Sequence, residues 1–147
     1  MNLRVNQTRR FLSTLLILLL PACGTFKETS STTFTAIDIE TTGLNHRKDK
    51  IIEIAAVKFR NGEILESRNW LINPNIPIPK EIQDLTGITP QMMKDAPSFK
   101  EVYPEFIAFI ETSVLLAHNA GFDMRFMTHK AEKDLLMSAP ANRVIDT

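Results

Sequence analysis

The sequence predicts an α/β fold with a mixed sheet, in which three antiparallel strands precede parallel strands and helices flank the sheet. Three observations support this prediction. Strand-like apolar runs recur early in the chain, an Asn61-Gly62 turn joins two of them, and a buried-strand pattern at Val114–Ala117 follows a helical pattern. A strand that follows a crossover helix pairs in parallel with an earlier strand. The 147 residues, 44% hydrophobic and 23% charged, suit one compact domain.

The first predicted strand begins at Phe34 and ends in two acids, two hydroxyls and a glycine. Side chains alternate along a strand, so Asp38 and Glu40 point the same way, roughly 7 Å apart along the backbone, while Ile37 and Ile39 face the other side. Two carboxylates placed in this way can share a divalent cation, and hard oxygen ligands suit Mg²⁺ or Mn²⁺. A bare Asp-x-Glu pattern is short, however, and is usually a strand end with two solvated acids.

The second and third strands are predicted at Ile51–Phe59 and Ile64–Asn73. Asn61-Gly62 between them is a strong signal for a two-residue hairpin, because a type I′ turn needs positive φ at both central residues. Prolines then end the third strand, since proline cannot donate a hydrogen bond to a sheet; they are Pro74, Pro77 and Pro79.

Two short helices are predicted after the third strand. Lys80–Leu85 forms the first, and Gly87 closes it as a left-handed helix cap. Thr89-Pro90 supplies an N-cap and a first-turn proline for the second.

A longer amphipathic helix is predicted after Ser98, because Ser98 and Glu101 form a capping box. Pro104 inside this helix should kink it or distort one turn. The apolar residues follow the spacing of one buried face, so we interpret the aromatic ones as core rather than as a platform for bases; this face consists of Phe99, Val102, Tyr103, Phe106 and Ile110.

The buried strand Val114–Ala117 leads into the sequence His118-Asn119-Ala120-Gly121-Phe122-Asp123 and then into a helical pattern. Asp123 falls in the first turn of that helix, where the partial positive charge of the helix end stabilises a carboxylate. The spacing alone is therefore compatible with a purely structural acid.

Three of these stretches resemble motifs of one family, the DnaQ-like or DEDD 3′→5′ exonucleases. Asp38-Ile39-Glu40-Thr41-Thr42-Gly43-Leu44 resembles the first motif, Leu85-Thr86-Gly87-Ile88-Thr89 a recurring segment, and His118 to Asp123 the second motif. The likeness covers residues 33–147, in the order of the family, and within the family it is to the proofreading group that includes the epsilon subunit of DNA polymerase III. It implies a ribonuclease-H-like fold.

The resemblance also implies a set of functional residues. Catalytic metal ligands would be Asp38, Glu40 and Asp123, holding two ions of Mg²⁺ or Mn²⁺ for hydrolysis of terminal phosphodiesters. The matched substrate-binding positions are Thr41, Thr42, Gly43, Leu44, Glu81, Thr86, His118 and Asn119. For Glu81 and Thr86 a helix end between two turns is an equal alternative, and His118 and Asn119 could simply order the loop after their strand.

The family takes a fourth acid and a general-base histidine from a third motif, which has no match before Thr147. We therefore expect a carboxyl-terminally incomplete domain with weak or absent turnover on its own. The expected substrate is the 3′ end of single-stranded DNA, or of RNA, with a polymerase subunit as a possible partner. The alternatives are a non-catalytic nucleic-acid-binding or polymerase-associated module and an inactive fragment.

The amino terminus has the layout of a secretory signal peptide, with arginines before the apolar run Phe11–Leu20. Leu20-Pro21-Ala22-Cys23 resembles a bacterial lipobox, which would make Cys23 a lipidated membrane anchor. The predicted organisation is a signal peptide at 1–23, a linker at 24–33 and the exonuclease domain at 34–147. A used signal places the protein in the bacterial envelope, whereas a misassigned start codon implies the cytoplasm.

Charge and cysteine content exclude some further classes of protein. Seventeen basic and seventeen acidic residues give a net charge of +0, so no global positive field attracts nucleic acid. The single cysteine excludes an internal disulfide and a cysteine-based zinc cluster.

Overall fold

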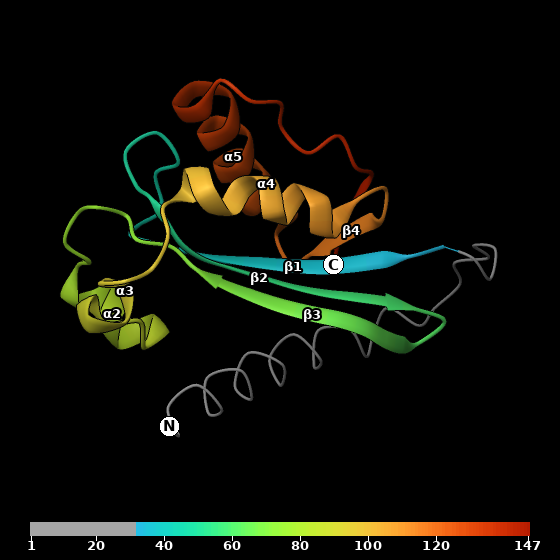
Figure 1. Ribbon diagram of the computed structural model, residues 1–147, viewed down its shortest axis with the longest axis horizontal. Coiled ribbons are helices and arrows are strands. Elements are labelled where there is room, and N and C mark those ends of the chain that lie inside the picture. Colours follow the sequence, from blue (N-terminus) through green and yellow to red (C-terminus); the bar gives the residue numbers. More distant parts are fainter. Residues whose placement is uncertain (1–31) are drawn as a thin grey trace.

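The computed structural model describes residues 32–147, so the predicted signal peptide and Cys23 lie outside the described residues. A five-stranded sheet with the strand order β3-β2-β1-β4-β5 forms the centre of the molecule (Figure 1). Strands β1, β2 and β3 pair antiparallel, whereas β4 pairs parallel with β1, and β5 parallel with β4. This order confirms the predicted mixed sheet. The strands are β1 (Phe34–Thr41), β2 (Ile51–Arg60), β3 (Glu63–Leu71), β4 (Val114–Ala117) and β5 (Val144–Asp146).

The helices are α2 (Lys80–Thr86), α3 (Pro90–Met93), α4 (Phe99–Ile110), α5 (Ala120–His129) and the π-helical segment η2 (Lys130–Leu135). Their ends follow the predicted local signals. Gly87 closes α2 in the left-handed conformation at φ 75°, and both hydrogen bonds of the Ser98–Glu101 capping box are present. Helix α4 runs as one α-helix across Pro104. The change to π-helical geometry at Lys130 is a feature that the spacing of apolar residues does not predict.

Helices α4 and α5 lie on one side of the sheet and bury its apolar face (Figure 1). The isoleucines of β1 that alternate with the acids, Ile37 and Ile39, enter this core. Tyr103 and Phe106 of α4 are fully buried in it, as expected for core residues rather than base-stacking residues. The core therefore holds β1 from the side opposite its acids.

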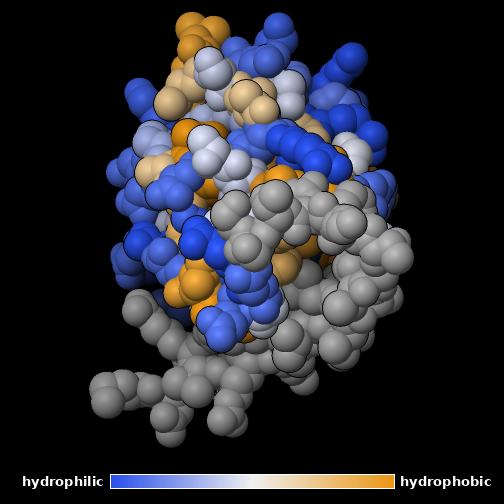
Figure 2. Space-filling model, turned by 90° about the vertical axis from the view of Figure 1, so that its right-hand side faces the viewer, coloured by the Kyte–Doolittle hydropathy of each residue, from blue (hydrophilic) through white to orange (hydrophobic). Residues whose placement is uncertain are grey.

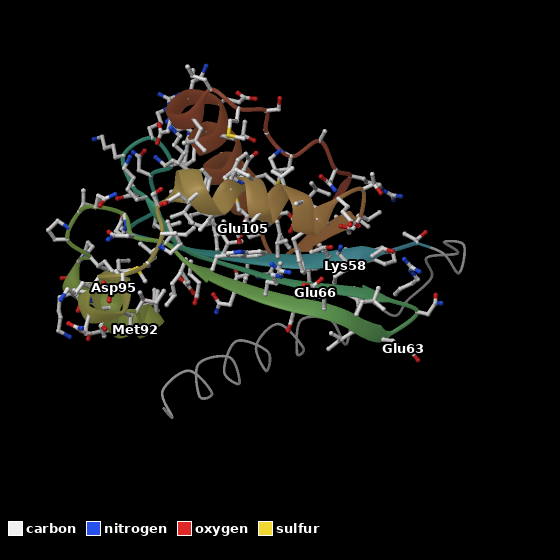
Figure 3. All side chains as sticks on the ribbon, viewed as in Figure 1. Lys58, Glu63, Glu66, Met92, Asp95 and Glu105 are labelled. Carbon is white, nitrogen blue, oxygen red and sulfur yellow. The ribbon has the colours of Figure 1, made fainter. Side chains whose placement is uncertain are left out.

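Polar contacts join α4 to the edge strand β3 as well. The indole N–H of Trp70 donates a hydrogen bond to Glu105 Oε2 at 3.2 Å. Figure 3 shows Glu105 on α4 above the sheet, with Lys58 and Glu66 on the neighbouring strands below it. Among the described residues, no helix is long and apolar enough to cross a membrane.

The β2–β3 hairpin forms the end of the sheet that lies away from the carboxyl end of β1 (Figure 1). Asn61 and Gly62 both have positive φ, 53° and 81°, which confirms the predicted two-residue turn. Seen from this end, the described surface is mainly hydrophilic, with smaller hydrophobic areas between (Figure 2).

Candidate active site: acids at the end of β1

The sheet register gathers three acids on one face. Glu40 of β1 is directly paired with Glu53 of β2, and Asp38 lies two residues before Glu40 on the same face. Directly paired residues of antiparallel strands have neighbouring side chains. Sequence reasoning missed Glu53, although it is the one charged residue in the otherwise apolar run 51–57 of β2, which was a usable signal. Glu53 is buried and accepts a hydrogen bond from Asn69 Nδ2 at 2.9 Å.

A fourth acid, Asp123, reaches β1 from the first turn of α5. Its Oδ1 accepts a hydrogen bond from the backbone N–H of Ile39, between the two acids of β1, at 3.1 Å. Strand β4 pairs with β1 only as far as Ala36, so the Asp123 carboxylate bonds the strand beyond the point where the parallel ladder ends. The start of α5 is held in turn by Asp146 Oδ1, which accepts from the N–H of Ala120 at 3.1 Å.

Burial and mutual repulsion make these acids hard to ionise. Burial, followed by the charges of Asp38, Glu53 and Asp123, raises the pKa of Glu40 to about 7. Burial and then the charge of Asp38 raise the pKa of Asp123 to about 7. The pKa of Asp38 is raised by burial, against the lowering effects of the Ile39 N–H and of His118, and burial also raises the pKa of Glu53. The site is thus a group of acids, Glu53 and Asp123 buried and Asp38 and Glu40 partly buried, that resist ionisation together.

The donor set fits a hard divalent cation, because its oxygens are carboxylates whose repulsion such a cation would relieve. Within residues 32–147, no three acidic, histidine or cysteine side chains are gathered closely enough to hold a metal ion by themselves. Mg²⁺ commonly uses only one or two carboxylates and completes its shell with water and substrate phosphate oxygens. Asp38, Glu40 and Asp123 are the side chains that could hold such ions.

The segment after Glu40 turns sharply away from the strand. The Thr41 hydroxyl donates to the carbonyl oxygen of Gly43 at 2.6 Å, and the Thr42 hydroxyl accepts from the N–H of Lys50 at 3.0 Å. Both predicted substrate-binding hydroxyls therefore take part in the fold of the loop. Leu44 follows with 86% of its surface exposed, which is unusual for a leucine in an ordered loop.

Helix α2 places the next two predicted positions at the same end of the sheet. Ile82 and Ile88, on either side of Thr86, pack in a small core around Ile52, the neighbour of Glu53. The Thr86 hydroxyl donates to the carbonyl oxygen of Ile82 at 2.8 Å and accepts from the N–H of Ile88 at 3.1 Å, which closes the helix end. The side chain of Glu81 is exposed.

His118 and Asn119 lie between β4 and α5, one strand away from the acids of β1. His118 Nδ1 lies 2.7 Å from the carbonyl oxygen of Thr147, and the ring is close enough to Asp38 to lower the pKa of that acid. Asn119 takes the left-handed conformation, φ 54°, at the N-cap of α5. Both residues thus shape the turn that delivers Asp123.

The raised pKa values predict that the metal-free protein loses stability as the pH rises. Between about pH 4 and about pH 7 the folded protein keeps protons on Glu40 and Asp123 that the unfolded chain has released, so the free energy of unfolding falls across this window. A divalent cation that binds the ionised acids should reverse the trend, with a larger gain at higher pH.

Thermal unfolding followed by circular dichroism checks this prediction, in EDTA and in millimolar MnCl₂, from about pH 5 to about pH 8. Glu40→Gln is the matched variant, because it removes one titrating group with little change in volume. It should make the metal-free unfolding temperature fall less steeply with pH. A metal-free unfolding temperature that rises through this window would contradict the electrostatic account of the site.

Comparison with known proteins identifies the family of this chain. The exonuclease family model, RNase_T, matches residues 35–147, which includes all four acids. The DNA polymerase III PolC-type of Caldanaerobacter subterraneus subsp. tengcongensis is 48% identical over 114 residues, and that of Bacillus subtilis 44% over 115 residues. Each match covers 78% of this chain but only 8% of the polymerase. The chain therefore spans a small part of these relatives.

Solved structures show the same architecture. Exonuclease X in complex with 5′ overhanging duplex DNA has a TM-score of 0.60 and 28% identity, over 77% of this chain and 58% of that one. An E. coli exonuclease I–single-stranded DNA complex has a TM-score of 0.69 and 19% identity, over 79% of this chain and 28% of that one. At that identity, the second likeness concerns the fold alone.

Proposed function

Because this chain belongs to the exonuclease family whose model matches residues 35–147, we propose that its acidic site removes nucleotides from the 3′ end of DNA by metal-assisted hydrolysis. One observation carries the proposal. Asp38, Glu40, Glu53 and Asp123 lie near one another at the carboxyl end of β1, where burial and neighbouring acid charges raise the pKa values of Glu40 and Asp123 to about 7. Such a group of buried and partly buried acids is costly unless a cation or a catalytic role accounts for it.

In this proposal the acids have separate tasks. Asp38 and Glu40 hold divalent cations from the strand, and Asp123 holds them from the helix side, where the Ile39 N–H fixes its orientation. Mg²⁺ or Mn²⁺ ions, two in the proposed reaction, supply polarisation of the phosphate and activation of a water when bound. Glu53 stays outside the ligand set, as a buried acid that is paired with Glu40 across the strands and accepts a hydrogen bond from Asn69.

The surroundings of the acids support a nucleic-acid end as the substrate. Leu44 and Leu85 are 86% and 80% exposed, on the two segments that flank the acid end of the sheet. Exposed apolar side chains beside a phosphodiester-cleaving site suit apolar contact with the face of a terminal base. DNA is favoured over RNA by the likeness to DNA polymerase III and to exonuclease X, and association with a polymerase is part of the same proposal.

The direction and metal dependence of hydrolysis test the proposal. A 5′-labelled single-stranded oligodeoxynucleotide should be shortened stepwise from its 3′ end in Mg²⁺ or Mn²⁺, slowly because no match to the third motif precedes Thr147, and EDTA should stop the reaction. The same oligodeoxynucleotide with a blocked 3′ end is the control and should resist. Binding without shortening would favour the non-catalytic nucleic-acid-binding module instead, and neither binding nor shortening would refute both.

A further inference from the structure

We propose that Asp49 is a positioning residue for the proposed exonuclease reaction, because it fixes the loop between Glu40 and the exposed Leu44. This inference rests on the proposed function of the acidic site. Asp49 lies in the polar loop between β1 and β2 and touches none of the four acids by hydrogen bond. Its carboxylate instead points back into the turn that follows Glu40.

Both carboxylate oxygens of Asp49 bind this turn. Oδ2 accepts from the backbone N–H of Asn45 at 2.8 Å, and Oδ1 accepts from the Thr42 hydroxyl at 3.3 Å. Main-chain bonds close the same loop, since the N–H of Asp49 donates to the carbonyl oxygen of Asn45 at 2.8 Å. The N–H of Thr42 donates to the carbonyl oxygen of Lys50, also at 2.8 Å. Asp49 thus ties the two sides of the loop together.

Gly43 packs directly against the same carboxylate. A Cβ atom on Gly43 would lie 2.6 Å from Asp49 Oδ2, 2.7 Å from Cγ and 2.8 Å from Oδ1. Real Cβ atoms do not approach other atoms so closely, and the carboxylate has little freedom to retreat because two hydrogen bonds hold it. Glycine is therefore required at position 43 by the presence of Asp49.

A buried lysine of the helical layer, Lys130, is linked to this loop through ion pairs. Lys130 of η2 is buried and forms an ion pair with Asp134 at 3.3 Å, and Asp134 also pairs with Lys50 at 3.5 Å. Burial lowers the pKa of Lys130, whereas the charges of Asp134 and then Asp49 act in the opposite direction. The loop thus brings charges of both signs near Lys130, those of Lys50 and Asp49.

The position of the loop connects Asp49 with the placement of the substrate. The residues that it holds, Thr42 to Asn45, begin one residue after Thr41 at the end of β1 and include the exposed Leu44. If the loop shifts, this surface moves relative to Asp38 and Glu40 while the acids stay on the sheet. A displacement of about 1 Å in substrate position can cost about 100-fold in rate.

A double-mutant cycle tests this inference in the full-length protein. Asp49→Ala and Gly43→Ala should each lower kcat/KM for a 3′-hydroxyl oligodeoxynucleotide roughly 100-fold, with KM raised about tenfold. In the Asp49→Ala background, Gly43→Ala should cost less than about threefold, because the carboxylate that the new methyl group would meet is gone. Asp49→Asn keeps an acceptor oxygen and should recover much of the loss.

Two controls separate positioning from general damage. Glu63→Ala removes an exposed acid at the hairpin, far from residues 41–45 (Figure 3), and its KM should stay within about twofold of the wild type. Amide hydrogen exchange at residues 42–45 should speed up in Asp49→Ala and not in Glu63→Ala. If Asp49→Ala does not fold, Asp49→Asn replaces it in the kinetic and hydrogen-exchange measurements, with smaller changes expected because it keeps one acceptor oxygen.

Three results would overturn the inference, namely an unchanged KM in Asp49→Ala, multiplicative losses in the double variant, or equal effects in Glu63→Ala. A wild-type protein that neither binds nor shortens DNA would instead remove the proposed function, and the positioning role with it. An active wild type with an unaffected Asp49→Ala variant overturns the positioning role alone.

Discussion

Asp38→Ala is expected to slow 3′→5′ hydrolysis by the full-length protein at least about 1,000-fold, since a lost metal ligand costs several kcal/mol of transition-state stabilisation. Asp38 is the first acid of the group, its pKa is raised by burial, and its charge raises the pKa values of both Glu40 and Asp123. Removing Asp38 therefore weakens metal binding and also removes a negative charge that raises the pKa values of Glu40 and Asp123. Initial rates on a 5′-labelled oligodeoxynucleotide measure the effect.

Two further variants make this result specific. Asp38→Asn keeps the volume of the side chain but not its charge, so it should lose activity to a similar extent. It should also raise the metal-free unfolding temperature at about pH 8, because it removes one of the repelling charges. Glu63→Ala removes an exposed acid at the hairpin, the end of the sheet away from the site (Figure 3), and should leave the rate unchanged. Activity of Asp38→Ala within tenfold of the wild type would refute the assignment.

Phe106→Ala is expected to lower the free energy of unfolding by about 3–5 kcal/mol, because it leaves a cavity in a fully buried part of the core. Phe106 also stacks edge-on against Trp70, with ring centroids 6.1 Å apart, so the loss reaches from α4 to the edge strand β3. For a domain of this size the unfolding temperature should fall by roughly 10–20 °C.

Phe99→Ala is the matched control, since Phe99 has the same side chain at the start of the same helix but is only partly buried. It should cost about 1–2 kcal/mol. Urea unfolding monitored by tryptophan fluorescence compares the two variants. Equal losses would show that the α4 contact with the sheet is not the main source of stability.

The parts of the fold that depend on neighbouring residues were predictable from the sequence. Asn61-Gly62 specified the hairpin, because few other residue pairs tolerate positive φ twice in succession. Ser98 and Glu101 specified the start of α4, and Gly87 the end of α2, by hydrogen bonds within a few residues. The alternation of Asp38 and Glu40 with isoleucines likewise predicted which face of β1 carries the acids.

The parts that depend on distant residues were not predictable in the same way. Glu53 joins the site through the register of β1 and β2, which shifts beside Glu40 and has no local signature. Position 43 appears in the sequence as an ordinary turn glycine, whereas its need for glycine comes from Asp49, six residues later. The π-helical turn at Lys130 likewise depends on the packing of η2 and not on the spacing of its apolar residues.

The hydrogen bond between Ile39 and Asp123 makes assembly of the acidic site depend on contacts between distant parts of the sequence. Its partners are 84 residues apart in the sequence, so the bond needs the closure of a long loop and cannot form before α5 has been synthesised. A chain still being synthesised or only partly folded carries Asp38 and Glu40 without their third acid. The proposed site is therefore incomplete until the chain has been synthesised as far as Asp123 and that residue has packed against β1.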